Sequence, residues 1–139
     1  MHSHLIADFG GVANTMPKFA AFVMLFSMAN AGLPGTSGFV GEWLVILASV
    51  KFNFWVAFLA ALSLILGAAY TLWMYKRVVY GEVANAHVAA LKDLSRREFW
   101  LLGTLAGLAL LIGLWPKPFI DVMHVSVVDL LAQVARSKL

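Results

Sequence analysis

The sequence predicts an all-α integral membrane protein with about three transmembrane helices, the first of them discontinuous, followed by a C-terminal amphipathic helix. Of its 139 residues, 62% are hydrophobic and only 12% are charged, whereas soluble domains have about 25% charged residues. The charged residues are clustered, and long apolar intervals separate the clusters. Polar groups are therefore too scarce to cover a water-facing surface, and the lack of cysteine excludes a disulfide-stabilised scaffold.

The N-terminal part of the chain is predicted to contain a connector and an interrupted helix. Residues 1–16 are expected to form a cytoplasmic connector. The segment 17–50 is apolar almost throughout, and it is expected to be a discontinuous transmembrane helix that is broken at 32–38. Proline and glycine disfavour helical backbone, and the break contains Gly32, Pro34, Gly35 and Gly38.

Two interpretations of this interrupted segment are compatible with its length. Helices over 19–33 and 38–50 would be roughly 22 and 20 Å long, so neither would comfortably cross a hydrocarbon layer of about 30 Å by itself. The segment is either a tight hairpin of two short spans or one helix that is broken near the middle of the membrane. We favour the broken helix, whose freed backbone groups would have to pack within protein or face a wet cavity.

Two further segments, 52–75 and 98–115, are predicted to be continuous transmembrane helices. The first contains no charged residue, and as a helix it would extend roughly 36 Å, enough to cross a bilayer with some tilt. The second is near the lower length limit for a span. Aromatic residues near the ends of both segments are typical of anchors at the membrane surface; they are Phe54, Trp55, Trp73, Tyr75, Phe99, Trp100 and Trp115.

The distribution of basic residues predicts the orientation of the chain. Short loops that are rich in Lys and Arg are typically cytoplasmic, and this indicates a cytoplasmic position for the loop 76–97. The tail 118–136 would then lie on the opposite side. Its apolar residues recur at three- and four-residue intervals, which predicts an amphipathic helix on the membrane surface or on partner subunits. The basic residues of the loop are Lys76, Arg77, Lys92, Arg96 and Arg97.

Glu42 is the only ionisable residue inside the apolar segments. It precedes Lys51 by nine residues, which places it roughly 13 Å from that end of the helix and close to the middle of the membrane. An acidic side chain at this depth costs about 2.5–3.5 kcal/mol on insertion scales. Because such residues usually mark ion or proton pathways, we expect Glu42 to be a member of a proton relay. The alternative is a protonated carboxyl group that only holds helices together.

Several polar residues near the break are candidates for the lining of a proton channel. Asn30, Thr36 and Ser37 flank the break and could hold water or a chain of hydrogen bonds, since transporters commonly build ion sites at interrupted helices. Weaker candidates on the next span are Ser63, Tyr70 and Thr71. The spacing of the histidines predicts no metal site, and no nucleotide-binding motif is present. Topology explains the basic loop better than nucleic-acid binding does.

The segment 28–42, MANAGLPGTSGFVGE, closely resembles the proton-translocating, antiporter-like membrane subunits of respiratory complex I, the NADH–quinone oxidoreductase. The resemblance extends over the whole chain, through IADFGG at 6–11, YKR at 75–77 and GLWPKP at 113–118. Related chains L and N and the multisubunit sodium/proton antiporters generally have a lysine near position 42. Because it has a glutamate at this position, the sequence is most similar to the chain M branch of this family.

The resemblance implies a role for the chain within a larger enzyme. It implies that Glu42 is the channel carboxylate nearest the periplasmic exit, in a bacterial inner membrane with the tail on the periplasmic side. It implies that this chain binds no cofactor, and that other subunits hold NAD, FMN, iron–sulfur clusters and quinone. The expected partners are the other membrane subunits of complex I, with chains L and N as neighbours, together with the lipid bilayer and protons.

One departure from the family pattern concerns length. The family's subunits have about fourteen helices, and their other channel residues, a glutamate and two lysines on earlier helices, have no counterpart here. We therefore expect a C-terminal fragment of such a subunit, corresponding to the last quarter of it. Two alternatives are a subunit of a multisubunit sodium/proton antiporter and a non-catalytic membrane assembly segment.

Overall fold

The computed structural model describes residues 6, 9–83 and 85–137, and its regular structure is helical, as predicted. Of the predicted connector 1–16, residues 1–5 and 7–8 lie outside the described residues. Ala7 and Asp8 of the IADFGG segment are therefore not described. The α-helices are α1 (Val12–Thr15), α2 (Pro17–Asn30), α3 (Ser37–Phe52), α4 (Phe54–Val78), α5 (Ala86–Ala89), α6 (Arg96–Leu114) and α7 (Lys117–Ser137).

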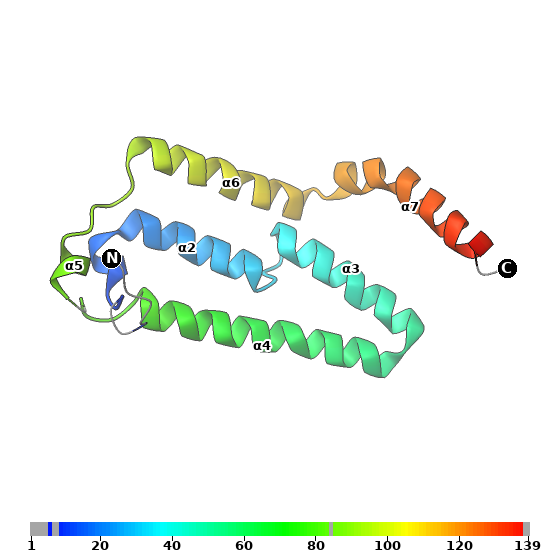
Figure 1. Cartoon of the computed structure of the whole chain (residues 1–139), viewed down its shortest axis with the longest axis horizontal. Coiled ribbons are helices and arrows are strands. Elements are labelled where there is room, and N and C mark those ends of the chain that lie inside the picture. The colour runs from blue at the N-terminus through cyan, green and yellow to red at the C-terminus, as the bar shows by residue number, and fades with distance from the viewer. Residues whose placement is uncertain (1–5, 7–8, 84, 138–139) are drawn as a thin grey trace.

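The helices α2 and α3 form the middle layer of the bundle. Figure 1 shows that α3 continues in the direction of α2 and that both lie along α4, which runs back beneath them. On the other side, α6 packs against both α2 and α3. The interruption between α2 and α3 is therefore enclosed by α4 on one side and by α6 on the other.

Within the described part of the chain, three helices are long and apolar enough to cross a membrane by length and composition: α4, α6 and α7, the last over Lys117–Arg136. The first two cover most of the segments 52–75 and 98–115. The described side chains of α7 are all exposed up to Arg136, and Figure 1 shows this helix extending away from the others. Because length and composition alone would also allow α7 to cross, the surface position of 118–136 stays a prediction.

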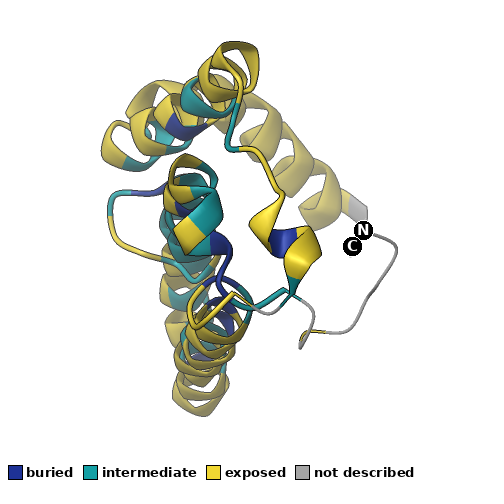
Figure 2. Ribbon diagram, turned by 90° about the vertical axis from the view of Figure 1, so that its left-hand side faces the viewer, coloured by how far each residue is buried: buried dark blue, intermediate teal, exposed yellow. Residues whose placement is uncertain are grey.

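Little of the apolar surface is buried within the chain. Figure 2 shows exposed residues over most of the ribbon, and large side chains such as Trp100, at 72% relative exposure, are open. One small core joins α2 to the end of α4 around Ala20, Tyr75 and Val79. There the Tyr75 hydroxyl donates a hydrogen bond to the Ala20 carbonyl at 2.9 Å. The bundle thus presents a surface suited to lipid or to further helices.

The N-terminus of α2 is capped by a residue far away in the sequence. Met16, which precedes the helix, makes no side-chain cap. Instead, the carboxylate of Asp93 accepts hydrogen bonds from the backbone N–H groups of Lys18 at 3.1 Å and Phe19 at 3.2 Å. The carboxylate thereby satisfies two of the N–H groups that α2 leaves free at its start, where Pro17 has no N–H group.

The ionised form of Asp93 is the one that makes this cap. Burial of the carboxyl group raises its pKa, but the N–H groups of Leu94, Lys18 and Phe19 and the charge of Lys18 outweigh that effect, so the pKa lies below its usual 3.8. A group whose pKa is lower in the folded state contributes stability at pH values above the unfolded pKa. That contribution is lost as the pH falls through the folded pKa.

We predict that Asp93→Ala lowers the temperature of thermal unfolding at neutral pH, with a smaller decrease for Asp93→Asn because the amide oxygen can still accept one hydrogen bond. The difference between the wild-type and Asp93→Ala proteins should shrink as the pH falls below 3.8. Thermal unfolding of the detergent-solubilised full subunit between pH 7 and pH 3 measures both effects. Asp121→Ala, on the exposed helix α7, is the control, and an equal decrease in that variant would contradict the capping role.

Candidate functional site

The interruption between α2 and α3 begins with a well-defined helix end. Gly32 has a φ angle of 76°, which places it in the left-handed region that favours glycine. The Leu33 N–H donates to the Met28 carbonyl at 3.0 Å, and the Gly32 N–H donates to the Ala29 carbonyl at 3.4 Å. This pair of hydrogen bonds is the Schellman motif, so the end of α2 is encoded by the glycine.

Thr36 orders the rest of the turn. Its hydroxyl donates to the Leu33 carbonyl at 2.7 Å, and its N–H donates to the same oxygen at 3.1 Å. The side chain is buried, with 2% relative exposure. The break is consequently an ordered turn in which a buried hydroxyl group has a partner, and α3 begins directly after it at Ser37.

Two glycines allow backbone to meet backbone around this turn. A Cβ atom added at Gly38 would overlap the carbonyl oxygen of Ala29, and one added at Gly113 would overlap the carbonyl group of Gly35. The first contact sets the start of α3 against the end of α2. The second sets the end of α6 against the turn itself. Both approaches depend on the missing side chains.

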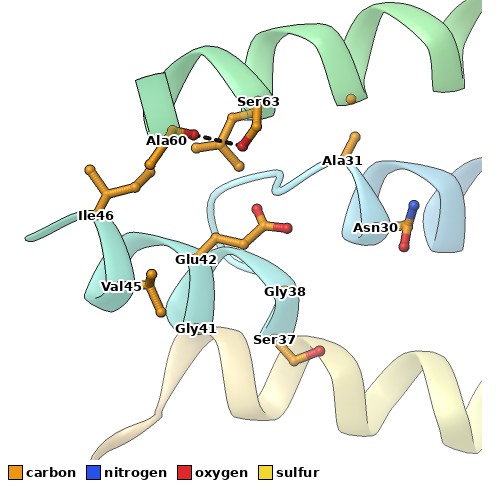
Figure 3. Close-up of a pocket in the computed structure, with 12 residues that line it drawn as sticks. Asn30, Ala31, Ser37, Gly38, Gly41, Glu42, Val45, Ile46, Ala60 and Ser63 are labelled. Carbon is orange, nitrogen blue, oxygen red and sulfur yellow. Dashed lines mark hydrogen bonds between the residues drawn. The ribbon is translucent and has the colours of Figure 1, made fainter. Parts of the chain in front are cut away.

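A pocket of about 590 Å³ lies beside the break, between α2, α3 and α4. Figure 3 shows its lining and the Glu42 side chain, which extends from α3 towards α4 and the end of α2. Glu42 is the one titratable side chain among the described residues that line this pocket. The lining residues are Asn30, Ala31, Ser37, Gly38, Gly41, Glu42, Val45, Ile46, Ala60, Ser63, Leu64 and Gly67.

The Glu42 carboxyl group is held in an unusual environment. Its Oε2 atom is buried and has no hydrogen-bond partner, a property that only Thr71 Oγ1 shares among the described side chains. Burying a polar atom without a partner costs free energy, and the cost is larger for a charged group. Water that entered the pocket could offset this cost by hydrogen bonding to the oxygen.

The structure brings some of the predicted channel residues together and leaves others apart. Asn30 and Ser37 line the pocket with Glu42. Thr36 does not line the pocket. Its hydroxyl instead donates a hydrogen bond within the turn, to the Leu33 carbonyl. Tyr70 is 60% exposed and does not line the pocket.

The residues that form the break have different surroundings. A Cβ atom at Gly32 would overlap Glu42, and one at Gly35 would face Leu114, while Pro34 is exposed in the turn. Ser63 lines the pocket, but its hydroxyl donates to the Ala60 carbonyl at 2.6 Å. Within the described part of the chain no group of three or more His, Cys, Asp or Glu residues could hold a metal ion.

Sequence reasoning named Ser63 on α4 but missed the other residues of this helix that line the pocket. Ala60, Leu64 and Gly67 line the pocket, and they recur at intervals of four and three residues, so they share one face of the helix. Two of the three are small, which leaves space opposite Glu42. This spacing could have indicated that the helix lines a pocket, but the same spacing is also common where helices simply pack closely.

Comparison with known proteins identifies the family. Residues 1–68 match the family model described as "NADH:quinone oxidoreductase/Mrp antiporter, TM". The chain is 45% identical over 130 residues to NADH-quinone oxidoreductase subunit M of Rhodobacter capsulatus, covering 94% of this chain and 25% of the relative. It is also 41% identical over 128 residues to NADH-ubiquinone oxidoreductase chain 4 of Arabidopsis thaliana, covering 92% and 26%. The chain belongs to the family of these antiporter-like membrane subunits of complex I.

The structural comparison agrees with this assignment. A chain in the structure of respiratory complex I from Thermus thermophilus with bound NADH matches with a TM-score of 0.74 and 38% identity, over 86% of this chain and 25% of that chain. The chain thus spans about a quarter of the length of the relatives that it matches.

We predict that Gly113→Ala destabilises this part of the subunit by about 1–3 kcal/mol, because the added methyl group would be forced against the backbone of the turn. Gly107→Ala on the same helix is the matched control, since nothing lies within 4 Å of its Cβ position. That change should be neutral or stabilising by up to about 1 kcal/mol. Thermal unfolding of the purified subunit measures both, and equal stabilities of the two variants would contradict the close approach of α6.

Proposed function

We propose that this chain is the C-terminal part of a proton-translocating membrane subunit of NADH–quinone oxidoreductase and that Glu42 transfers the proton on the exit side of its channel. The observation that carries this proposal is the Glu42 carboxyl group, which has a buried and unpartnered Oε2 atom in a pocket beside an interrupted helix. Intramembrane acids usually mark proton pathways, and interrupted helices commonly provide ion sites in transporters.

In this proposal, water and neighbouring charges drive the loading and release of the proton. Unit charges interact much more strongly in a low-dielectric site than in water. A charge gained or lost on a nearby group of the complete subunit would therefore change the relative stability of the protonated and ionised carboxyl groups. The Asn30 and Ser37 side chains line the same pocket and could orient water molecules that exchange the proton with Glu42.

The proposed orientation places the 76–97 loop in the cytoplasm and the C-terminal tail in the periplasm of a bacterial inner membrane. In Figure 1, α5 and the chain that connects α4 to α6 lie at one end of the bundle, and α7 extends from the other end. The five basic residues of the loop, Lys76, Arg77, Lys92, Arg96 and Arg97, favour the cytoplasmic side for the first end.

The redox chemistry belongs to other subunits in this proposal. NADH oxidation and quinone reduction would occur where NAD, FMN, iron–sulfur clusters and quinone are bound, and this chain would contribute proton transfer alone. Chains L and N are the proposed neighbours among the membrane subunits. The exposed apolar surface of the bundle would be covered by those subunits, by the remainder of its own subunit and by lipid.

A sodium/proton antiporter subunit is the second candidate, because the matching family model also includes antiporters of that kind. The two functions differ in the transported ion and in the coupling to NADH oxidation. Relatives named as NADH-quinone oxidoreductase subunits favour the first candidate.

We predict that Glu42→Gln, made in the full-length subunit of the assembled complex, slows proton transfer through this subunit by about tenfold or more, because a positioned proton donor typically contributes a factor of about 10² to 10⁴. The amide has nearly the same shape, so assembly should persist. Proton uptake during NADH oxidation, measured in inverted membrane vesicles with and without sodium, tests this.

Asp129→Asn, on the exposed helix α7, is the control for the loss of one carboxylate. Unimpaired pumping by an assembled Glu42→Gln complex would support the assembly-segment alternative and contradict the proposal. Sodium movement that depends on Glu42 would favour the antiporter function instead.

A further inference from the structure

We propose that Gly32 is a positioning residue for the Glu42 carboxyl group. Because Gly32 has no side chain, it leaves space for that group in the corner between the end of α2 and the face of α4. This inference rests on the proposed function of Glu42 as a proton carrier. It assigns to a residue of the break a direct steric influence on that carrier, beyond its part in ending α2.

The geometry at Gly32 joins the two residues directly. A Cβ atom built on Gly32 would overlap the Glu42 Oε2 atom, and it would lie 3.4 Å from Leu64 Cδ2 on α4. The carboxyl oxygen thus occupies the space that any other residue at this position would fill. Because Oε2 is buried at this place, the missing side chain determines where the carboxyl group resides.

The corner differs electrostatically from the open part of the pocket. It lies against the C-terminal turn of α2, where the partial negative charge of a helix is concentrated. Among the described residues of α2, α3 and α4 that line the pocket, Glu42 on α3 is the one titratable side chain. The partial charge at the end of α2 therefore lies next to the carboxyl group. A methyl group at Gly32 would move the carboxyl group away from that partial charge.

Gly32 has two roles that must be separated experimentally. Its φ of 76° means that alanine would strain the backbone even without Glu42. Gly35 provides a matched comparison three residues later, with a φ of 92°. A Cβ atom there would meet Leu114 Cδ2 at an ordinary 3.6 Å and is not near Glu42. Gly35→Ala therefore measures backbone strain in the same turn without displacing the carboxyl group.

The test compares Gly32→Ala with Gly35→Ala, each alone and each combined with Glu42→Asp, in the full-length subunit of the assembled complex. The aspartate side chain is one methylene shorter, so its carboxyl group can withdraw from an added methyl group. We expect Gly32→Ala to reduce proton transfer by about tenfold, approaching the effect of Glu42→Gln. The Gly32→Ala/Glu42→Asp double variant should recover at least about threefold relative to Gly32→Ala. Glu42→Asp should give no such recovery in the Gly35→Ala background, because distant effects add independently.

The infrared absorption of the protonated carboxyl group gives a readout of position that does not depend on pumping. The Glu42 band is assigned by its loss in Glu42→Gln. We expect it to shift in Gly32→Ala and to stay in place in Gly35→Ala, because the band responds to the surroundings of the carboxyl group. Equal effects of the two alanine variants, with no recovery by aspartate and no band shift, would overturn the inference.

Two remaining outcomes are also decisive. Gly32→Ala could prevent assembly. In that case, assembly that Glu42→Asp restores in the Gly32→Ala background but not in the Gly35→Ala background supports steric positioning of the carboxyl group, and no restoration contradicts it. If Glu42→Gln leaves pumping intact, the proposed function fails, while the infrared comparison still shows whether Gly32 places the carboxyl group.

Discussion

Contact between backbone and backbone at the turn from α2 to α3 is the constraint on which the arrangement of this chain depends. Gly38 lets the start of α3 lie against the Ala29 carbonyl, and Gly113 lets the end of α6 lie against Gly35. These approaches hold the start of α3 against α2 and the end of α6 against the turn. A turn that is packed in this way can exist at membrane depth, because its polar groups are held by protein rather than exposed to lipid.

The site depends on what this packing leaves open. The pocket borders the turn, and Glu42 reaches into it from the second turn of α3. Small residues on α4, Ala60 and Gly67, provide the space opposite. The same absence of bulk that permits helices to approach thus also leaves room for a carboxyl group and for water. The structure therefore connects the path of the backbone to the chemistry proposed for the side chain.

The sequence predicted those features that depend on local composition. Charge-free runs indicated α4 and α6, a proline among glycines indicated the interruption, and a single acid within apolar surroundings indicated Glu42. Features that depend on pairs of distant residues were missed. The Asp93 cap joins residues that are 75 positions apart in the sequence, and the Tyr75–Ala20 hydrogen bond joins residues that are 55 positions apart. No local sequence pattern marks either contact. The hydrogen bond of Thr36 to Leu33 follows from the geometry of the turn, and the outward position of Tyr70 follows from the rotation of α4, which spacing alone does not determine.

The Asp93 cap makes the length of the connection from α4 to α6 matter more than its composition. The carboxylate reaches the amides of Lys18 and Phe19 at about the limit of normal hydrogen bonding, 3.1 and 3.2 Å. Exchanging one exposed residue for another between Val79 and Asp93 would leave this reach unchanged. Insertion or deletion of a residue near Asp93 would shift the carboxylate and uncap α2. Relatives should consequently vary at the exposed positions of this stretch while rarely differing in the number of residues close to the aspartate.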